Sequence, residues 1–137
     1  MSRTPLMEAC IYCKTEQAKD LIKKCADLDA KCNDGLTALM YAAGNGAEEI
    51  AKLLIDQGAD VNAKSTPYKD TAILYAASNG YKKIVELLLA AGANPDIENI
   101  DGESPMSQAE YNGHSEVVDL LSYHYEQMIH TADGILF

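Results

Sequence analysis

The stretch TALMYAAGNGAEEIAKLLIDQGADVNAK, residues 37–64, decides the fold of this chain. It begins with Thr37, whose hydroxyl suits the N-terminus of a helix, and Asn45-Gly46 then supplies two residues that tolerate positive φ. A second helix follows, with apolar residues at i, i+3 and i+4 that form one stripe: Ile50, Leu53 and Leu54. Gly58 ends that helix as a C-terminal cap. The stretch therefore predicts a short helix, a turn, a second helix and a loop.

Three further stretches align on this one, namely residues 4–31, 71–98 and 104–127. The four stretches start 33, 34 and 33 residues apart. A constant period near 33 residues predicts a stack of similar units, each too small to bury its own apolar face. We expect one domain over residues 1–130, with units over about 1–33, 34–67, 68–100 and 101–130, and a tail over 131–137.

The two end units carry polar residues where the inner units are apolar. In the first unit, Gln17 and Asp20 align with Ile50 and Leu53 of the second unit. In the fourth unit the polar replacements are Ser107, Glu110 and Ser122. Solenoids need polar outer faces at both ends, so we expect four units to form the whole array.

The end of the chain is expected to depart from the repeat pattern. Tyr125 takes the place of the cap glycine, so the last helix should continue toward Ile129. The tail over 131–137 is expected to fray or to pack on the last helix. Its end, Ile135-Leu136-Phe137, also resembles ligands of carboxylate-binding PDZ domains, and this alternative stays open.

Several short motifs recur in phase. The second unit contains TALMYAA, NGAEEIAKLL and GADVNAK, and the third contains TAILYAA, NGYKKIVELLL and GANPDIE. With these motifs the chain resembles the ankyrin-repeat family over residues 4 to about 127. The resemblance implies an all-α solenoid of helix-turn-helix units, joined by β-turn or hairpin-like loops. The His of the family pattern is replaced by Met7, Met40, Leu74 and Ser107, which exchanges a buried polar link for packing.

Composition excludes several classes of protein. Of the 137 residues, 47% are apolar and 23% are charged, so the chain can form a packed core and is not disordered throughout. No apolar run approaches the roughly 18–20 residues that cross a bilayer, and the first residues lack the apolar core of a secretory signal peptide. We therefore expect an intracellular protein, cytoplasmic or nuclear, that is a monomer and binds no membrane.

The charge of the chain disfavours nucleic acid as a partner. The 21 acidic and 11 basic residues give a net charge of −10, which opposes binding to a phosphate backbone. Residues 101–137 hold seven Asp and Glu and no Lys or Arg. Such a field can steer a protein with a basic surface toward this end, although a merely solubilising role is the alternative.

The four cysteines all fall in the first unit: Cys10, Cys13, Cys25 and Cys32. A helix of about ten residues, roughly 15 Å long, separates the two pairs, which is too far for one zinc ion with ligands at ~2.3 Å. We expect structural thiols in a reducing compartment, and neither a metal nor a cofactor. A thiol redox switch at Cys25 and Cys32 is the alternative function, because both lie near the same loop.

No catalytic motif is present, so we expect no enzyme activity. The sequence has no Gly-x-Ser-x-Gly, no phosphate-binding glycine loop and no His-Glu-x-x-His. His114 matches the Gly-His turn of the family pattern, and the resemblance implies a structural role for it. Tyr41 and Tyr75 occupy equivalent positions of the first helices and are expected to stack in the core.

A protein-binding role follows from the resemblance, because ankyrin arrays use their loop tips and the exposed side of their first helices as a concave face for protein partners. The chain would then act as an adaptor or a blocking inhibitor. Carried over position by position, the pattern selects these residues: Arg3, Ile11 and Tyr12; Asn33, Asp34, Leu36, Gly44 and Asn45; Tyr68, Lys69, Asp70, Ser78 and Asn79; Ile100, Asp101, Glu103, Tyr111 and Asn112. Three tyrosines among carboxylates (Tyr12, Tyr68 and Tyr111) suit an interface with aromatic anchors and an acidic rim. The alternative is that these are ordinary solvated loop residues.

The loop over residues 65–70, SerThrProTyrLysAsp, is one residue longer than its counterpart and lacks the glycine found at Gly35 and Gly102. Surface loops absorb insertions at small cost, so neutral drift is one explanation. The other is that Tyr68 protrudes into the partner. Just before this loop, Asp60-Val61-Asn62 resembles the ankyrin context that asparagine hydroxylases modify, and this context is also the family consensus.

Overall fold

The computed structural model describes residues 3–24 and 27–132 of the chain. Within these ranges the backbone forms eight α-helices and no β-strand, arranged as four successive pairs. The helices are α1 Pro5–Ile11, α2 Thr15–Lys23, α3 Ala38–Asn45, α4 Glu48–Asp56, α5 Ala72–Ser78, α6 Lys82–Ala90, α7 Pro105–Tyr111 and α8 Ser115–Ala132. The expected all-α solenoid is therefore confirmed.

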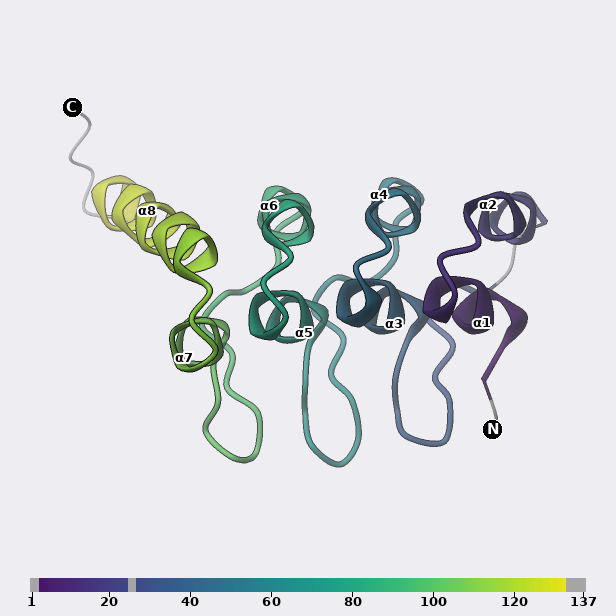
Figure 1. Cartoon of the computed structure of the whole chain (residues 1–137), viewed down its shortest axis with the longest axis horizontal. Coiled ribbons are helices and arrows are strands. Elements are labelled where there is room, and N and C mark those ends of the chain that lie inside the picture. The colour runs from purple at the N-terminus through teal and green to yellow at the C-terminus, as the bar shows by residue number, and fades with distance from the viewer. Residues whose placement is uncertain (1–2, 25–26, 133–137) are drawn as a thin grey trace.

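The helices lie in two layers (Figure 1). The first helices of the pairs, α1, α3, α5 and α7, pack side by side in one row, and the second helices, α2, α4, α6 and α8, form the other row. Long loops connect the pairs and project from the side of the first row that faces away from the second helices. The first helices thus lie between the loops and the second row.

Each first helix begins at a hydroxyl cap. The side chains of Thr4, Thr37, Thr71 and Ser104 accept hydrogen bonds of 3.2, 3.3, 3.3 and 3.1 Å from the backbone N–H three residues later. Each bond satisfies one of the otherwise unpaired N–H groups at the start of a helix and contributes about 1 kcal/mol. The cap expected at Thr37 is confirmed, and its equivalents act in the same way.

The core contains buried residues of the first helices, among them Leu39 and Ile73, together with the apolar stripes of the second helices. Their fully buried members are Ile50, Leu54, Ile84, Leu88 and Leu121. The pairs Ala42-Ala43 in α3 and Ala76-Ala77 in α5 are also inaccessible to solvent, so adjacent first helices approach closely. Full burial of a Leu or Ile side chain contributes about 1.5–3 kcal/mol, so these stripes contribute substantially to stability.

The end units turn their polar replacements outward, as the sequence predicts. These residues are all exposed: Gln17, Asp20, Ser107, Glu110 and Ser122. At the glycine position of the last unit, the Tyr125 hydroxyl donates a 3.1 Å hydrogen bond to the Pro95 carbonyl oxygen. Helix α8 continues past Ile129 to Ala132 and so includes two residues that the repeat pattern assigned to the tail. Residues 133–137, with the PDZ-like end, lie outside the described residues.

No helix within the described ranges has both the length and the apolar character to cross a bilayer. The longest, α8, has 18 residues, and polar side chains alternate with apolar ones along it. Along this helix Val117 and Leu121 are buried, whereas Tyr123 and Met128 are exposed.

The turns within the helix pairs need a left-handed backbone. Gly46, Gly80 and Gly113 have φ values of 73°, 77° and 76°. At Gly80 a Cβ would also collide with the His114 imidazole, so glycine is required there for two reasons. The equivalent residue of the first repeat is Cys13, which adopts φ 53° in spite of its side chain. A non-glycine residue in this conformation costs about 1–2 kcal/mol.

Candidate protein-interaction site

Three loops project from the row of first helices, and we call them the first, second and third fingers: residues 32–36, 65–70 and 99–103. In each finger the N–H of the first residue donates to the carbonyl oxygen of the last residue, at 3.1, 2.8 and 3.0 Å respectively. The second finger contains the extra residue expected from the sequence, and its Thr66–Pro67 peptide bond is cis.

Neighbouring fingers contact each other. The Ile100 N–H donates to the Tyr68 carbonyl oxygen at 3.0 Å, which joins the tips of the second and third fingers. Gly35 of the first finger lies so close to Thr66 of the second that a Cβ at Gly35 would collide with the Thr66 backbone. The fingers therefore form a continuous row on one side of the molecule (Figure 1).

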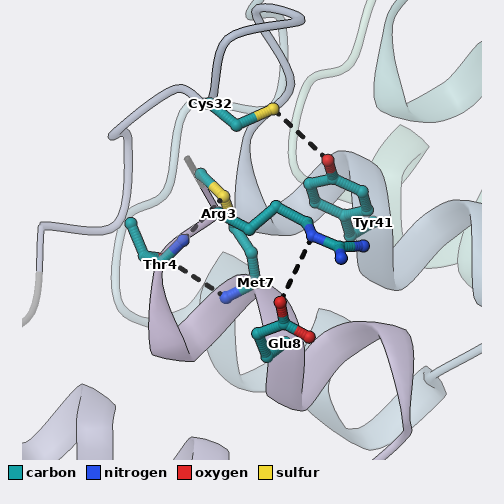
Figure 2. A network of polar contacts seen from close by, with 6 residues as sticks. All are labelled: Arg3, Thr4, Met7, Glu8, Cys32 and Tyr41. Carbon is teal, nitrogen blue, oxygen red and sulfur yellow. Dashed lines mark hydrogen bonds and ion pairs between the residues drawn. The ribbon is translucent and has the colours of Figure 1, made fainter. Parts of the chain in front are cut away.

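Each finger is also tied to the first helix that follows it, through equivalent residues: Tyr41 in α3, Tyr75 in α5 and Gln108 in α7. The Tyr41 hydroxyl lies 3.3 Å from Cys32 Sγ (Figure 2), and the Tyr75 hydroxyl donates to Asp70 Oδ2 at 2.9 Å. In α7, Gln108 Nε2 donates to Glu103 Oε2 at 2.9 Å. Both tyrosines are partly buried and pack against the core, and their hydroxyls reach the fingers.

The two tyrosine hydroxyls are held protonated by their surroundings. Burial raises the pKa of Tyr41 to about 12, and the hydrogen bond with Cys32 adds to this rise. Burial also raises the pKa of Tyr75, and its hydrogen bond to the Asp70 carboxylate acts in the same direction. Arg3 opposes the rise at Tyr41 with its positive charge; its Nε forms a 3.2 Å ion pair with Glu8 Oε1 close by (Figure 2).

Asn99 joins the second and third fingers at their base. Its Nδ2 donates to Asp70 Oδ1 at 2.9 Å and to Glu103 Oε1 at 2.8 Å. Its Oδ1 accepts from the backbone N–H groups of Asp101 at 3.0 Å and of Glu103 at 2.9 Å. These four bonds use the whole hydrogen-bonding capacity of the amide. Because two backbone donors fix Oδ1, the Nδ2 group has to face the two carboxylates.

A second set of bonds crosses between repeats at the C-terminal ends of the first helices. Asn79 Nδ2 donates to the Gly44 carbonyl oxygen at 3.3 Å, and Asn112 Nδ2 donates to the Ser78 carbonyl oxygen at 3.0 Å. His114 Nε2 also lies 3.0 Å from the Ser78 carbonyl oxygen, which confirms its structural role. Two residues selected as partner contacts, Asn79 and Asn112, therefore already bind the preceding repeat.

The residues selected from the sequence differ in how far they are open to a partner. Four large side chains are well exposed, Tyr12 at 62%, Tyr68 at 56%, Ile100 at 54% and Tyr111 at 86%. The exposed polar members are Arg3, Asn33, Asp34, Asn45, Lys69, Asn79, Asp101 and Asn112. The partly buried members are Ile11, Leu36, Gly44, Asp70, Ser78 and Glu103. Among the selected residues, the large exposed side chains are thus four in number, and three of them are tyrosines.

Sequence reasoning missed the residues that orient the fingers. Asn99 and Gln108 were not selected, and Tyr75 was assigned to the core. The repetition of tyrosine at positions 41 and 75 was the one cue to a role outside the core. Nothing in the sequence marks Asn99, because its importance depends on how closely two separate fingers approach.

The cysteines form no recognisable metal site in the part of the chain that the structure describes. Cys10 and Cys32 are buried and Cys13 is exposed, all three as free thiols, and Cys25 lies outside the described residues. No group of three or more His, Cys, Asp or Glu side chains in the described part could hold a metal ion. The thiol alternative depends on Cys25, so the described residues do not support it.

Comparisons with known proteins agree with this architecture. The family model for ankyrin repeats (3 copies) matches residues 1–65 and 63–133. Ankyrin repeat and KH domain-containing protein mask of Drosophila melanogaster is 41% identical over 104 residues, 75% of this chain. The human Ankyrin repeat and KH domain-containing protein 1 is 40% identical over 64 residues, 47% of this chain. The human SMC5-SMC6 complex localization factor protein 1 is 41% identical over 59 residues, 42% of this chain.

The chain spans only a small part of each of these relatives. The aligned regions cover 3%, 2% and 6% of their respective lengths. What the chain shares with each of them is therefore one short segment.

Proposed function

Because the chain belongs to the ankyrin-repeat family, we propose that it holds a partner protein on the concave side formed by the fingers and the exposed ends of the first helices. Ankyrin repeats generally mediate protein–protein interaction and are generally non-catalytic. The chain would act by occupying the surface of its partner, either as an adaptor that bridges two proteins or as an inhibitor that blocks one.

One observation carries this proposal: four large side chains are exposed at positions that the family pattern assigns to the concave side. These are Tyr12, Tyr68, Ile100 and Tyr111. Interface energy is concentrated in a few residues, and tyrosine is enriched among them. A repeat scaffold with a well-packed core needs none of these side chains for its own stability.

The charge of the molecule indicates the kind of partner. The net charge of −10 and the absence of Lys and Arg from residues 101–137 favour a protein with a basic surface over nucleic acid. The chain is proposed to bind as a monomer inside the cell, in the cytoplasm or the nucleus. The name of one relative links that protein to the SMC5-SMC6 complex, which is consistent with protein partners.

The proposal is tested by affinity capture with three forms of the full chain. The wild type is compared with a Tyr12→Ala, Tyr111→Ala double variant and with Glu49→Ala, which removes an exposed side chain from α4 in the opposite row. We expect mass spectrometry to identify proteins that the wild type and Glu49→Ala retain and the double variant loses. Equal capture by all three forms would place the partner elsewhere and overturn the proposal.

A further inference from the structure

The tips of the second and third fingers present an exposed pair, Tyr68 and Ile100, which we call the fingertip pair. Their side chains are 56% and 54% exposed. The 3.0 Å bond from the Ile100 N–H to the Tyr68 carbonyl oxygen holds their backbones side by side. Large side chains on a backbone that is already fixed lose little freedom when they bind, which suits them to act as anchors.

Three carboxylates lie on the same two fingers. Asp70 and Glu103 share the Asn99 amide at the base, and Asp101 follows Ile100 at the tip. With Lys69 as the one cation of the two fingers, their net charge is −2.

Neutral donors alone hold the two carboxylates at the base. Besides the Asn99 amide, Asp70 accepts from the Tyr75 hydroxyl and Glu103 accepts from the Gln108 amide. The four ion pairs found within residues 3–24 and 27–132 involve Arg3, Lys19, Lys52 and Lys83, and none of them reaches these fingers. A carboxylate has about four lone-pair positions, so both groups keep acceptor capacity for a further donor.

We propose that the fingertip pair and the finger carboxylates together receive an arginine side chain of the partner protein. This inference rests on the function proposed above. Tyr68 and Ile100 cover the aliphatic stem of the arginine, and the guanidinium donates to Asp101 and toward the carboxylates at the base. Arginine fits better than lysine because its planar fork binds carboxylates in bidentate fashion and stacks on an aromatic ring.

The charge around the fingers brings a basic segment to this end of the array. The acidic residues of 101–137 act over a distance of about one Debye length, roughly 8 Å at physiological ionic strength. Such a field raises the association rate, whereas local contacts with the fingertip pair slow dissociation. The two contributions can be separated by substituting a finger carboxylate and a carboxylate on α8.

A random 12-residue peptide library displayed on phage is the probe. The full chain is panned in parallel as wild type and as a Tyr68→Ala, Ile100→Ala variant, whose unfolding midpoint is checked first. We expect the peptides enriched by the wild type but not by the variant to carry arginine beside an apolar residue. The strongest peptide is then synthesised with arginine, with lysine and with citrulline at that position.

Binding of these peptides to Asp101→Asn is compared with binding to Glu116→Gln, a matched loss of one exposed charge on α8. We expect the dissociation constant of the arginine peptide to rise at least about fivefold for Asp101→Asn and less than about twofold for Glu116→Gln. The lysine and citrulline peptides should bind wild type more weakly than the arginine peptide.

Other outcomes overturn the inference. These are no enriched peptide, no excess of arginine in the fingertip-dependent peptides, or equal losses for Asp101→Asn and Glu116→Gln. If the Tyr12→Ala, Tyr111→Ala variant loses proteins captured from a lysate but peptide enrichment does not depend on the fingertip pair, this inference fails while the proposed function stands. If no concave-side variant affects the proteins captured from a lysate, the proposed function fails as well.

Discussion

Asn99 and Asp70 belong to different fingers, yet a 2.9 Å hydrogen bond from Asn99 Nδ2 to Asp70 Oδ1 joins their side chains. The exposed fraction of Asn99 is only 9%, so this bond is largely shielded from competing water. Together with the contact between Ile100 and Tyr68, it sets the position of the third finger relative to the second. The row is therefore built by contacts between neighbouring fingers and not by any finger alone.

Replacing Asn99 tests this relationship. Asn99→Ala should lower the free energy of unfolding by about 2 kcal/mol or more, because it leaves two backbone N–H groups without their acceptor and takes one of two donors from each of the Asp70 and Glu103 carboxylates. Asn99→Asp keeps the shape but sets a third carboxylate beside Asp70 and Glu103, so it should be more harmful at pH 7 than at pH 4. Urea unfolding at both pH values measures this, and an Asn99→Asp protein as stable as wild type at pH 7 would contradict it.

The core and the polar ends should respond very differently to truncation. Leu54→Ala and Leu88→Ala remove fully buried side chains and should each cost about 2–5 kcal/mol. Gln17→Ala and Glu110→Ala remove exposed side chains and should change stability by about 0.5 kcal/mol at most. Thermal melts followed by circular dichroism compare the four variants. Equal losses at both kinds of position would show that the end units do not face outward.

Cys13→Gly should stabilise the protein by about 0.5–1 kcal/mol. The substitution relieves the strain of a left-handed residue, about 1–2 kcal/mol, and this gain is partly offset by the greater freedom of glycine in the unfolded chain. Chemical denaturation measures the change. Cys13→Ala is the control, because it removes the thiol but keeps the strain, and it should bring no such gain.

Alanine substitutions at two equivalent glycines distinguish the stability cost of a steric collision from the cost of backbone strain. Gly80→Ala should cost more than Gly113→Ala, since a Cβ at Gly80 collides with the His114 ring and a Cβ at Gly113 meets nothing within 4 Å. Both variants share the cost of positive φ, about 1 kcal/mol. Denaturation midpoints of the two proteins check the order, and the reverse order would be incompatible with the position of the ring.

Tyr41 should make stability fall at alkaline pH. Its pKa rises from the ordinary 10.0 to about 12 on folding, so between these values the native state binds more protons than the unfolded state. The stabilisation is complete below pH 10 and is lost as the pH rises toward 12. The free energy of unfolding should therefore decline more steeply over this interval in wild type than in Tyr41→Phe. Parallel slopes would show that the hydroxyl does not keep its proton on folding.

Variants of the concave side should alter binding and spare the fold. Once a partner is identified, Tyr68→Ala and Tyr111→Ala should raise its dissociation rate, at a cost of about 2 kcal/mol for a true anchor. Asp101→Ala should make binding less sensitive to salt, and the loss of its contact with the partner arginine should also raise the dissociation rate. Surface plasmon resonance at two salt concentrations resolves these effects. If Glu49→Ala on α4 weakens binding as much as the tyrosine variants while the melting temperature is unchanged, the partner docks on the opposite row.

Most of the fold could be predicted from the sequence because its determinants are local and repeated. Thr37 and Ile50 recur in phase as Thr71 and Ile84, and each performs the same physical task in its own unit. The sequence predicted that α8 continues toward Ile129, whereas the helix ends at Ala132.

The candidate site was harder to predict because its contacts join units that differ in sequence. Cys32, Ser65 and Asn99 begin the three fingers at equivalent positions, yet only Asn99 is long enough to bond both neighbouring carboxylates. From the sequence alone, Asp70 resembles an ordinary solvated carboxylate, whereas in the structure it accepts hydrogen bonds from Tyr75 and Asn99. Cys13 could have been recognised as a left-handed residue by its alignment with the turn glycines.

The bonds from Asn79 to Gly44 and from Asn112 to Ser78 both run from a later repeat to the repeat before it. In each case the donor is an asparagine side chain of the later repeat, and the acceptor is a backbone carbonyl oxygen of the earlier repeat. A ribosome also delivers the repeats in this order, so the third and fourth units each complete a first-helix end of the unit made just before them. We therefore expect the array to assemble progressively from its N-terminal end during synthesis. The third and fourth repeats should each stabilise the first helix of the preceding repeat as they fold.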